Sequence, residues 1–250
     1  MRLDGARRVR ALVAYDGTGY GGFQRQSNAP SVQEVLEAAL ERVTGEAGQV
    51  LGAGRTDAGV HAEGQVIAFD TDWRHSLADL ERALNALLPA DVAVRGLAEA
   101  APGFHPRYDA LSRRYRYGVY NAATRCPLSR LYRLHVAAPL DVAAMNRAAA
   151  LLVGEHDFAA FGQPTTGDVT VRRVFLAEWH VGWAPGWLDF EIEANAFLYR
   201  MVRSIVGTLL EVGQGRLGVD EFAAILASRD RSRAGQTAPA HGLTLVEVRY

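Results

Sequence analysis

Cysteine is nearly absent from this chain of 250 residues, and lysine is absent altogether. The one cysteine, Cys126, cannot form an internal disulfide and cannot build a thiolate metal site by itself. This excludes a disulfide-stapled secreted domain and fits a reducing compartment. Because lysine is absent, all 27 basic side chains are arginines, whose planar guanidinium groups bind phosphate in a bidentate manner and stack on bases. A coding bias toward arginine explains the same composition.

Long apolar runs are also lacking. The runs that occur are broken by Arg, Glu or Gly, so none approaches the roughly 20 residues that a membrane-spanning helix needs. The N-terminal residues have neither the apolar core nor the small-residue cleavage site of a secretory signal. We therefore expect a soluble cytoplasmic protein that binds no membrane, with 49% hydrophobic residues to fill its core.

Charge is balanced over the whole chain but not along it. The 27 basic and 28 acidic residues give a net charge of -1, which neither indicates nor excludes a nucleic-acid partner. Residues 101–150, however, hold eight arginines against two aspartates, a local net charge of +6. Five tyrosines of the same segment offer stacking faces: Tyr108, Tyr115, Tyr117, Tyr120 and Tyr132. The segment predicts either a polyanion-binding surface or a solvated arginine-rich strand, and composition does not separate the two.

Hydrophobic periodicity predicts the elements of the first half. Alternating apolar residues indicate strands, whereas apolar residues three and four positions apart indicate helices. The expected elements are a strand at 8–15, a helix at 31–44, strands at 49–53 and 64–70, a helix at 76–88 and a strand at 92–100. Ser31 and Glu34 have the spacing of a capping box at the start of the first helix. The order β-α-β-β-α-β is typical of a ferredoxin-like unit.

The second half repeats this order without obvious sequence identity. We expect a strand at 111–120, a helix at 140–153, strands at 171–182 and 187–195, helices at 198–213 and 219–227, and a strand at 243–249. The two halves, residues 1–104 and 105–250, are joined where APGFHP interrupts regular structure. The loops at 16–30 and 121–139 exceed the usual connection length and are candidates for substrate contact.

The predicted fold class is α+β. Two ferredoxin-like β-α-β-β-α-β halves are expected to merge into one large, mainly antiparallel sheet. Helices are expected on one face of that sheet, with an active-site cleft between the halves.

The densest group of functional side chains lies in the segment GAGRTDAGVHA, residues 52–62. Arg55, Asp57 and His61 place a cation, a carboxylate and an imidazole within seven positions. The glycines miss the spacing of a dinucleotide-binding loop, a P-loop needs lysine, and no clustered His or Cys supports a metal site. A structural hairpin in which Asp57 caps its own turn explains the same residues, so local composition leaves both possibilities open.

The string GRTDAGVHA resembles the active-site motif of the tRNA pseudouridine synthase A family. The resemblance continues in chain order through five further blocks: YDGTGYGGFQRQ (15–26), SVQE (31–34), SRRYRYGVYN (112–121), NAFLYRMVRSIVGTLLEVG (195–213) and AGQTAPAHGL (234–243). Two positions depart from the family pattern, since Phe23 stands where the family often has Trp and Arg200 where it more often has His or Asn. Arg200 adds a cation beside the expected cleft.

The resemblance implies an isomerase that converts uridine to pseudouridine at positions 38, 39 and 40 of the tRNA anticodon stem-loop. It implies a homodimer that binds one tRNA across both subunits and acts in the cytoplasm. It implies no DNA partner, and a reaction that uses neither metal nor cofactor. Binding is expected to depend on tRNA shape more than on base identity, because one site that accepts neighbouring positions cannot read a fixed sequence.

The resemblance also implies the site residues. Asp57 is expected to be the catalytic nucleophile. The substrate-binding residues are expected to be Arg203, which pairs with the aspartate, Tyr115, which stacks on the uracil, Arg55, which holds the flipped nucleotide, and Leu243, which lines the base pocket. These residues are expected to meet between the halves. The roles make chemical sense because a flipped base needs aromatic and arginine contacts in place of its lost stacking.

Two other functions fit parts of the sequence. A non-catalytic module of two RNA-recognition-motif units shares the β-α-β-β-α-β order, but the aromatic signatures of such units are absent and Asp57 would have no task. A metal-dependent phosphoesterase using Asp57 and His61 would lose activity with a chelator. The ordered set of motifs favours the pseudouridine synthase.

Overall fold

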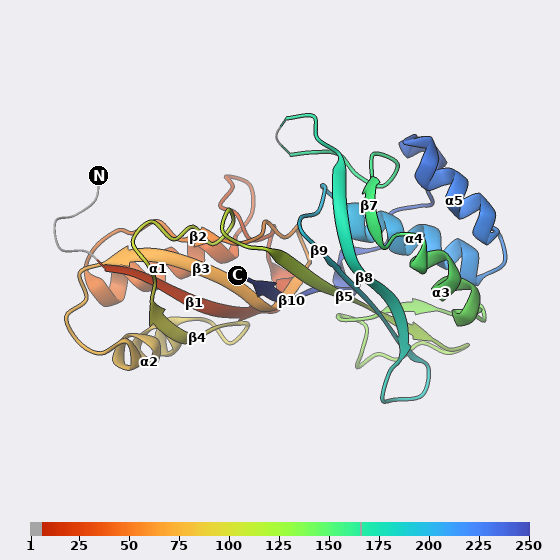
Figure 1. Cartoon of the computed structure of the whole chain (residues 1–250). Coiled ribbons are helices and arrows are strands. Elements are labelled where there is room, and N and C mark those ends of the chain that lie inside the picture. Colours follow the sequence, from red (N-terminus) through yellow and green to blue (C-terminus); the bar gives the residue numbers. More distant parts are fainter. Residues whose placement is uncertain (1–6, 166) are drawn as a thin grey trace. The chain divides into compact units, whose positions relative to one another are not determined.

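The computed structural model describes residues 7–165 and 167–250, so residues 1–6 and 166 of the two predicted halves lie outside the described part. The chain forms two compact units, whose elements are labelled in Figure 1. The first unit comprises the residues up to Leu111 together with Leu245–Tyr250, and the second comprises Ser112–Thr244. Within this described part, ten strands and five α-helices confirm the predicted α+β class.

The first unit contains α1, α2 and the strands around β1. Its elements are β1 (Arg7–Tyr15), α1 (Val32–Thr44), β2 (Leu51–Gly52), β3 (His61–Thr71), α2 (Leu77–Leu87), β4 (Val92–Glu99) and, from Leu245 onward, β10 (Leu243–Arg249). β1 lies between β3 and β4 and is antiparallel to both, while β2 pairs with β3. β10 follows β3 in the sheet, where a Cβ on Gly64 would lie 2.2 Å from the Val246 carbonyl oxygen.

Helix caps and alternating burial explain why these segments take these forms. The Ser31 side chain accepts a hydrogen bond from Glu34 N at 3.2 Å, and Gly45 ends α1 in the left-handed region with φ 79°. In β1, residues Val9, Ala11 and Val13 are buried while those between them are exposed, because alternate side chains of a strand point to opposite faces.

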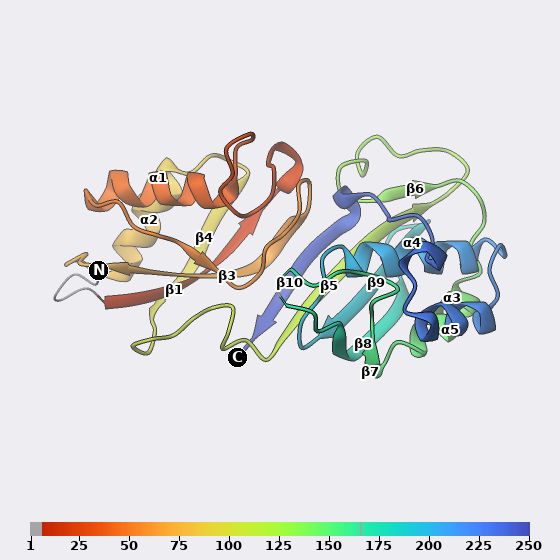
Figure 2. The same cartoon turned by 90° about the horizontal axis from the view of Figure 1, so that it is seen from above.

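The second unit contains α3, α4 and α5 with the strands around β9. Its elements are β5 (Ser112–Asn121), β6 (Leu134–Val136), α3 (Val142–Ala150), β7 (Gly154–Asp157), β8 (Val171–Val181), β9 (Trp187–Ala194), α4 (Met201–Gly213) and α5 (Val219–Ser228). The sheet order is β5-β9-β8-β7 with antiparallel pairs, and β6 is parallel to β5. The three helices lie together in this unit (Figure 2), with α3 packed on α4, α5 and β8.

α4 is the core helix of the second unit. It is buried along nearly its whole length, and Met201, Ile205 and Leu209 are fully covered. Phe190 and Ile192 of β9 are also fully buried. A helix that is covered on nearly all sides is surrounded by protein, so α4 is a core element of this unit.

The structure differs from the expected elements in several places, among them α4, which begins at Met201 and not at residue 198. The strands β6 and β7 were not predicted, because three and four residues are too few for a periodic signal. α3 ends at Ala150, three residues before the expected end. β3 begins at His61, so this histidine belongs to a strand and not to the preceding loop.

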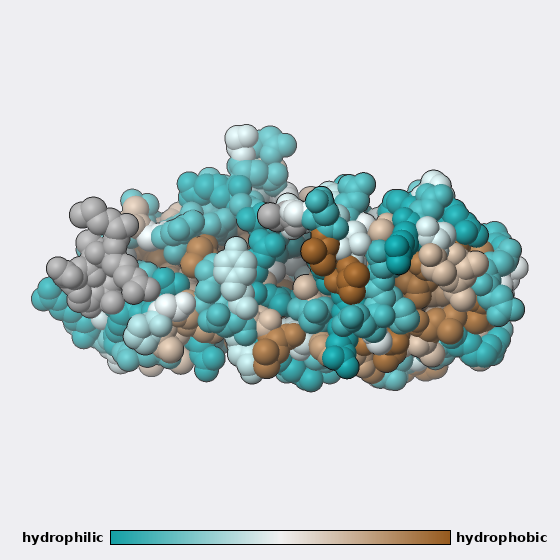
Figure 3. All heavy atoms as spheres, turned by 45° about the horizontal axis from the view of Figure 1, so that its top comes forward, coloured by the Kyte–Doolittle hydropathy of each residue, from teal (hydrophilic) through white to brown (hydrophobic). Residues whose placement is uncertain are grey.

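The described surface is mainly hydrophilic. Within the described residues, no helix combines the length and the apolar character needed to cross a bilayer. On the face drawn in Figure 3, hydrophobic atoms form small separate groups among hydrophilic ones. The most exposed large apolar side chains, Leu128 and Trp183, both belong to the second unit.

Candidate active site

The segment that carries Asp57 connects β2 to β3 in the first unit. Asp57 is half-buried, Arg55 is exposed and Thr56 between them is buried. Gln65, a fully buried residue of β3, holds this segment from one side, because its amide oxygen accepts from Gly54 N at 3.1 Å and its amide nitrogen donates to Gly54 O at 2.8 Å. These two bonds fix the backbone immediately before Arg55.

The loop that follows β1, residues 16–31 (the β1 loop), holds the Asp57 segment from the other side. Phe23 N donates to Thr56 O at 3.1 Å, and Gly22 forms an isolated antiparallel bridge with Asp57. The buried hydroxyl groups of Tyr15 and Thr56 are hydrogen-bonded at 2.7 Å. The neighbours of Asp57 are therefore fixed by the β1 loop, which restricts where the Asp57 carboxylate points.

Two glycines allow this close contact between backbones. Gly22 has φ +118°, and a Cβ there would lie 2.6 Å from Thr56 O. A Cβ on Gly17 would lie 2.0 Å from Val60 O. No side chain fits in either place, so packing requires glycine at these two positions of the YDGTGYGG stretch.

His61 is the buried residue that joins the two segments. Its side chain is almost fully covered, and its Nδ1 accepts a hydrogen bond from Gly17 N at 3.0 Å. Asp16 Oδ1 lies 3.1 Å from the same Nδ1 atom. The sequence did not reveal a role for His61, nor for Tyr15 or Gln65, because each acts on a residue distant in the chain.

Tyr115 lies on β5 in the second unit and is half-buried. It is opposite Ile192 of β9, and its ring packs edge-on against Phe197 with centroids 5.2 Å apart and an interplanar angle of 90°. This edge-to-face contact restrains the ring. Tyr117, two positions later on the same strand, shares its face of the sheet.

Arg203 lies in the first turn of α4 and is half-buried. Its Nε donates to Ala238 O at 2.7 Å, and Ala238 N donates back to Arg203 O at 3.0 Å. The segment around Ala238 is itself pressed onto α4, because a Cβ on Gly207 would lie 1.8 Å from Gln236 O. The bond from Nε orients the guanidinium of Arg203, and the main-chain bond holds Ala238 against the same turn of α4.

Tyr117 connects Arg203 to Leu243. Its hydroxyl donates to Pro239 O at 2.9 Å, and a Cβ on Gly242 would meet its ring at 2.6 Å. Burial raises the pKa of Tyr117 above its ordinary value, although the positive charge of Arg203 opposes this shift, so the phenol stays neutral. Leu243, which is buried, follows the turn that covers this ring. Arg203 and Leu243 therefore both lie near Tyr117, and Tyr115 lies on the same strand, β5, two positions before Tyr117.

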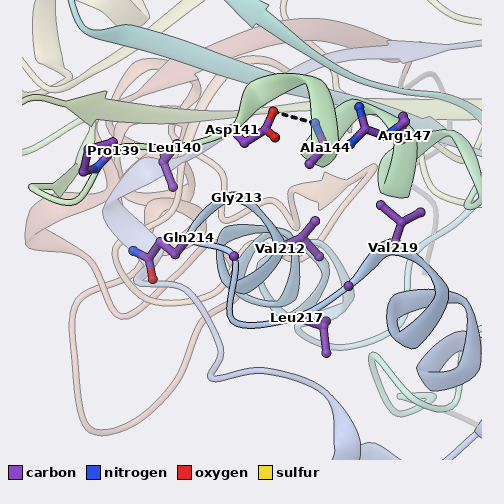
Figure 4. Close-up of a pocket in the computed structure, with 12 residues that line it drawn as sticks. Pro139, Leu140, Asp141, Ala144, Arg147, Val212, Gly213, Gln214, Leu217 and Val219 are labelled. Atoms are coloured by element: carbon purple, nitrogen blue, oxygen red, sulfur yellow. Dashed lines mark hydrogen bonds between the residues drawn. The ribbon is translucent and has the colours of Figure 1, made fainter.

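A separate hollow of about 700 Å³ lies in the second unit, where α4 ends and α3 and α5 begin. Figure 4 shows Asp141, Gln214 and Arg147 at its wall, with Asp141 accepting from Ala144 N to cap α3. None of the expected site residues lines it. Within residues 7–165 and 167–250, no three or more His, Cys, Asp or Glu side chains are grouped to hold a metal ion.

Comparison with known proteins identifies the family. A family model described as tRNA pseudouridine synthase matches residues 11–109 and 148–250. Curated relatives named tRNA pseudouridine synthase A are 50% identical over 250 residues in Chloroflexus aurantiacus, 46% over 246 in Roseiflexus castenholzii and 45% over 245 in Geotalea uraniireducens. Each alignment covers 98% of this chain, with 89%, 91% and 100% of the respective relatives.

A solved Cbf5-Nop10-Gar1 complex has a TM-score of 0.37 and 14% identity, covering 95% of this chain and 48% of that one. A likeness this weak supports no inference. The sequence relatives place the protein in the class of pseudouridine synthases, which are RNA-modifying isomerases. The chain belongs to the tRNA pseudouridine synthase A family.

The glycine contact at the Asp57 segment gives a matched pair of variants. Gly17→Ala is expected to lower kcat for pseudouridine formation about tenfold or more, because the added methyl group displaces Val60 and the turn before it. Gly19→Ala, in the same short turn, meets nothing within 4 Å and is expected to retain activity. Steady-state rates on tRNA and thermal midpoints of both variants check this. Equal rates for the two would show that the close contact is not needed for catalysis.

Proposed function

We propose that the protein converts uridine to pseudouridine at positions 38, 39 and 40 of the tRNA anticodon stem-loop, with Asp57 as the nucleophile and without metal or cofactor. The observation that carries this is the half-buried Asp57 inside GRTDAGVHA, on a segment held by β3 on one side and by the β1 loop on the other. A nucleophile needs such a fixed position near its target atom.

The reaction needs no external reactant. The bond between ribose C1′ and uracil N1 breaks, the uracil turns, and C1′ joins C5; the C5 proton is released and N1 gains a proton. Asp57 either attacks C1′ to form a glycosyl ester or removes the C2′ proton, and both routes begin from the ionised carboxylate. An ionised aspartate is favoured by a neighbouring arginine, the role we propose for Arg203.

The other residues are proposed to hold the same flipped uridine. Tyr115 stacks on the uracil, Leu243 lines the base pocket and Arg55 contacts the nucleotide beside the nucleophile. Local packing supports the roles of Tyr115 and Arg203. The Tyr115 ring is restrained by Phe197, and Arg203 is oriented by Ala238.

Release of tritium from uridine C5 tests the reaction. With tRNA transcripts labelled at C5 and with a chelator present, the wild type is expected to release tritium, and Asp57→Asn is expected to reduce release below detection because the amide cannot act as the nucleophile. Both proteins should melt at similar temperatures and bind tRNA alike. Tight tRNA binding without tritium release by the wild type would support the RNA-binding module and overturn the enzyme assignment.

The arginine-rich segment divides into arginines that serve the fold and arginines that face solvent. Arg133 Nη1 lies 3.0 Å from Asp189 Oδ1, and its guanidinium is 3.8 Å from the centre of the Trp187 ring. Its charge is therefore compensated inside the second unit. Arg125 and Arg130 are exposed. We propose that these two exposed arginines bind RNA phosphates, since exposed guanidinium groups reach a polyanion most readily.

Charge reversal tests this phosphate contact. The double variant Arg125→Glu/Arg130→Glu is expected to weaken tRNA binding several-fold and to lower the salt slope of log affinity by about 0.7 to 0.9 for each lost contact. The control Arg42→Glu/Arg74→Glu makes the same charge change at two exposed arginines of the first unit. If both double variants have the affinity and slope of the wild type, Arg125 and Arg130 do not contact the RNA.

Two further features are proposed from the family resemblance. The protein works as a cytoplasmic homodimer that binds one tRNA across both subunits. Each unit is a variant of the ferredoxin-like fold, which is supported by the order β1-α1-β2-β3-α2-β4 in the first unit.

A further inference from the structure

His61 has no part in the reaction described so far, yet it is buried at the start of β3, four residues after Asp57. A buried imidazole keeps its place only when its polar atoms are satisfied. Its Nδ1 lies within hydrogen-bond distance of Asp16 and Gly17, which directly follow β1. The histidine therefore joins the strand that leaves the Asp57 segment to the loop that packs on that segment.

The two contacts of Nδ1 require opposite protonation states. The backbone N–H of Gly17 always carries its hydrogen, so it needs a lone pair on Nδ1, 3.0 Å away. The carboxylate of Asp16, 3.1 Å from the same atom, needs a proton there. A neutral imidazole with its proton on Nε2 satisfies Gly17, whereas an imidazolium satisfies Asp16.

Asp16 does not depend on His61 for its hydrogen bonds. Its Oδ1 accepts from Thr18 N at 2.9 Å and from the Thr18 hydroxyl at 2.6 Å, which caps the short turn Gly17–Gly19. The neutral imidazole therefore accepts from Gly17 N, while Asp16 keeps its two hydrogen bonds from Thr18. In this state the bond from Gly17 to His61 is complete.

Two further contacts connect the Gly17–His61 hydrogen bond to the turn that carries Asp57. Gly17 is seated on the Val60 carbonyl, where a Cβ would lie 2.0 Å from the oxygen. Val60 N in turn donates to Asp57 O at 3.1 Å and closes the turn that presents the carboxylate. Release of Gly17 from His61 removes one of the hydrogen bonds that keep the β1 loop on this segment, the one nearest to Val60.

We propose that neutral His61 is a positioning residue, which fixes the β1 loop on the turn of Asp57 through its Nδ1. The inference rests on the proposed role of Asp57. A side chain at position 61 that offers Gly17 N no acceptor loosens this hold on the turn, and the chemical step slows.

The segments around His61 also carry Tyr15, Asp16, Tyr20, Arg55, Asp57 and Glu63. The Tyr20 hydroxyl donates to Asp91 Oδ1 at 2.8 Å. Burial and the bond to Asp91 raise the pKa of Tyr20, so its phenol stays neutral.

Two substitutions at His61 separate positioning from core filling. Asparagine places its amide oxygen where Nδ1 lies and accepts from Gly17 without titrating, whereas leucine fills similar space and offers no acceptor. In single-turnover tritium release, His61→Leu is expected to slow the reaction by about 10- to 100-fold with the Kd for tRNA changed less than about twofold. His61→Asn is expected to stay within about threefold of the wild-type rate.

The outcomes distinguish this inference from the proposed function. If His61→Asn is as slow as His61→Leu, or if His61→Leu is as fast as wild type, the positioning role is wrong. If His61→Leu does not fold, His61→Gln replaces it, because the longer glutamine side chain fills the site but carries its amide beyond the place of Nδ1. A rate for His61→Gln equal to that of His61→Asn would overturn the inference. A wild type without tritium release would instead refute the enzyme assignment itself.

Discussion

The position of Asp57 depends on one constraint. The backbone of the β1 loop lies directly against the backbone of the Asp57 segment. Gly17 and Gly22 lie against Val60 O and Thr56 O, where no side chain fits. Such contacts are stiff, because backbone atoms cannot change rotamer. The main chain that carries the Asp57 carboxylate is therefore held in place by backbone contacts.

The second unit uses the same device around α4. Gly207 lies against Gln236 O, which seats the segment that bonds reciprocally to Arg203 through Ala238. The ring of Tyr117 then fills the space under Gly242, next to Leu243. Both units thus place functional side chains on rigid elements and use glycine where a loop must approach closely. This explains why the motifs that carry the chemistry are rich in glycine.

The positions of the helices and the motif around Asp57 could be predicted from the sequence. The helices carry long periodic signals and side-chain or glycine caps, such as Ser31 and Gly45 of α1, so their positions were predicted within a few residues. Asp57 and Arg55 stand in a specific motif. The strands β6 and β7 are too short to show a period, and no local signal reveals that β10 returns to the first unit. The role of His61 was also hidden, because its partner Gly17 lies 44 residues earlier.

Conversion of anticodon-arm uridines by Asp57 is tested most directly by locating pseudouridine in a product tRNA. A transcript with uridine at positions 38, 39 and 40 is incubated with wild type and with Asp57→Asn, and every uridine is then assayed for conversion. The structure and the family together predict pseudouridine at these three positions with the wild type and at none with the variant. Conversion elsewhere in the transcript, or conversion by Asp57→Asn, would contradict the assignment.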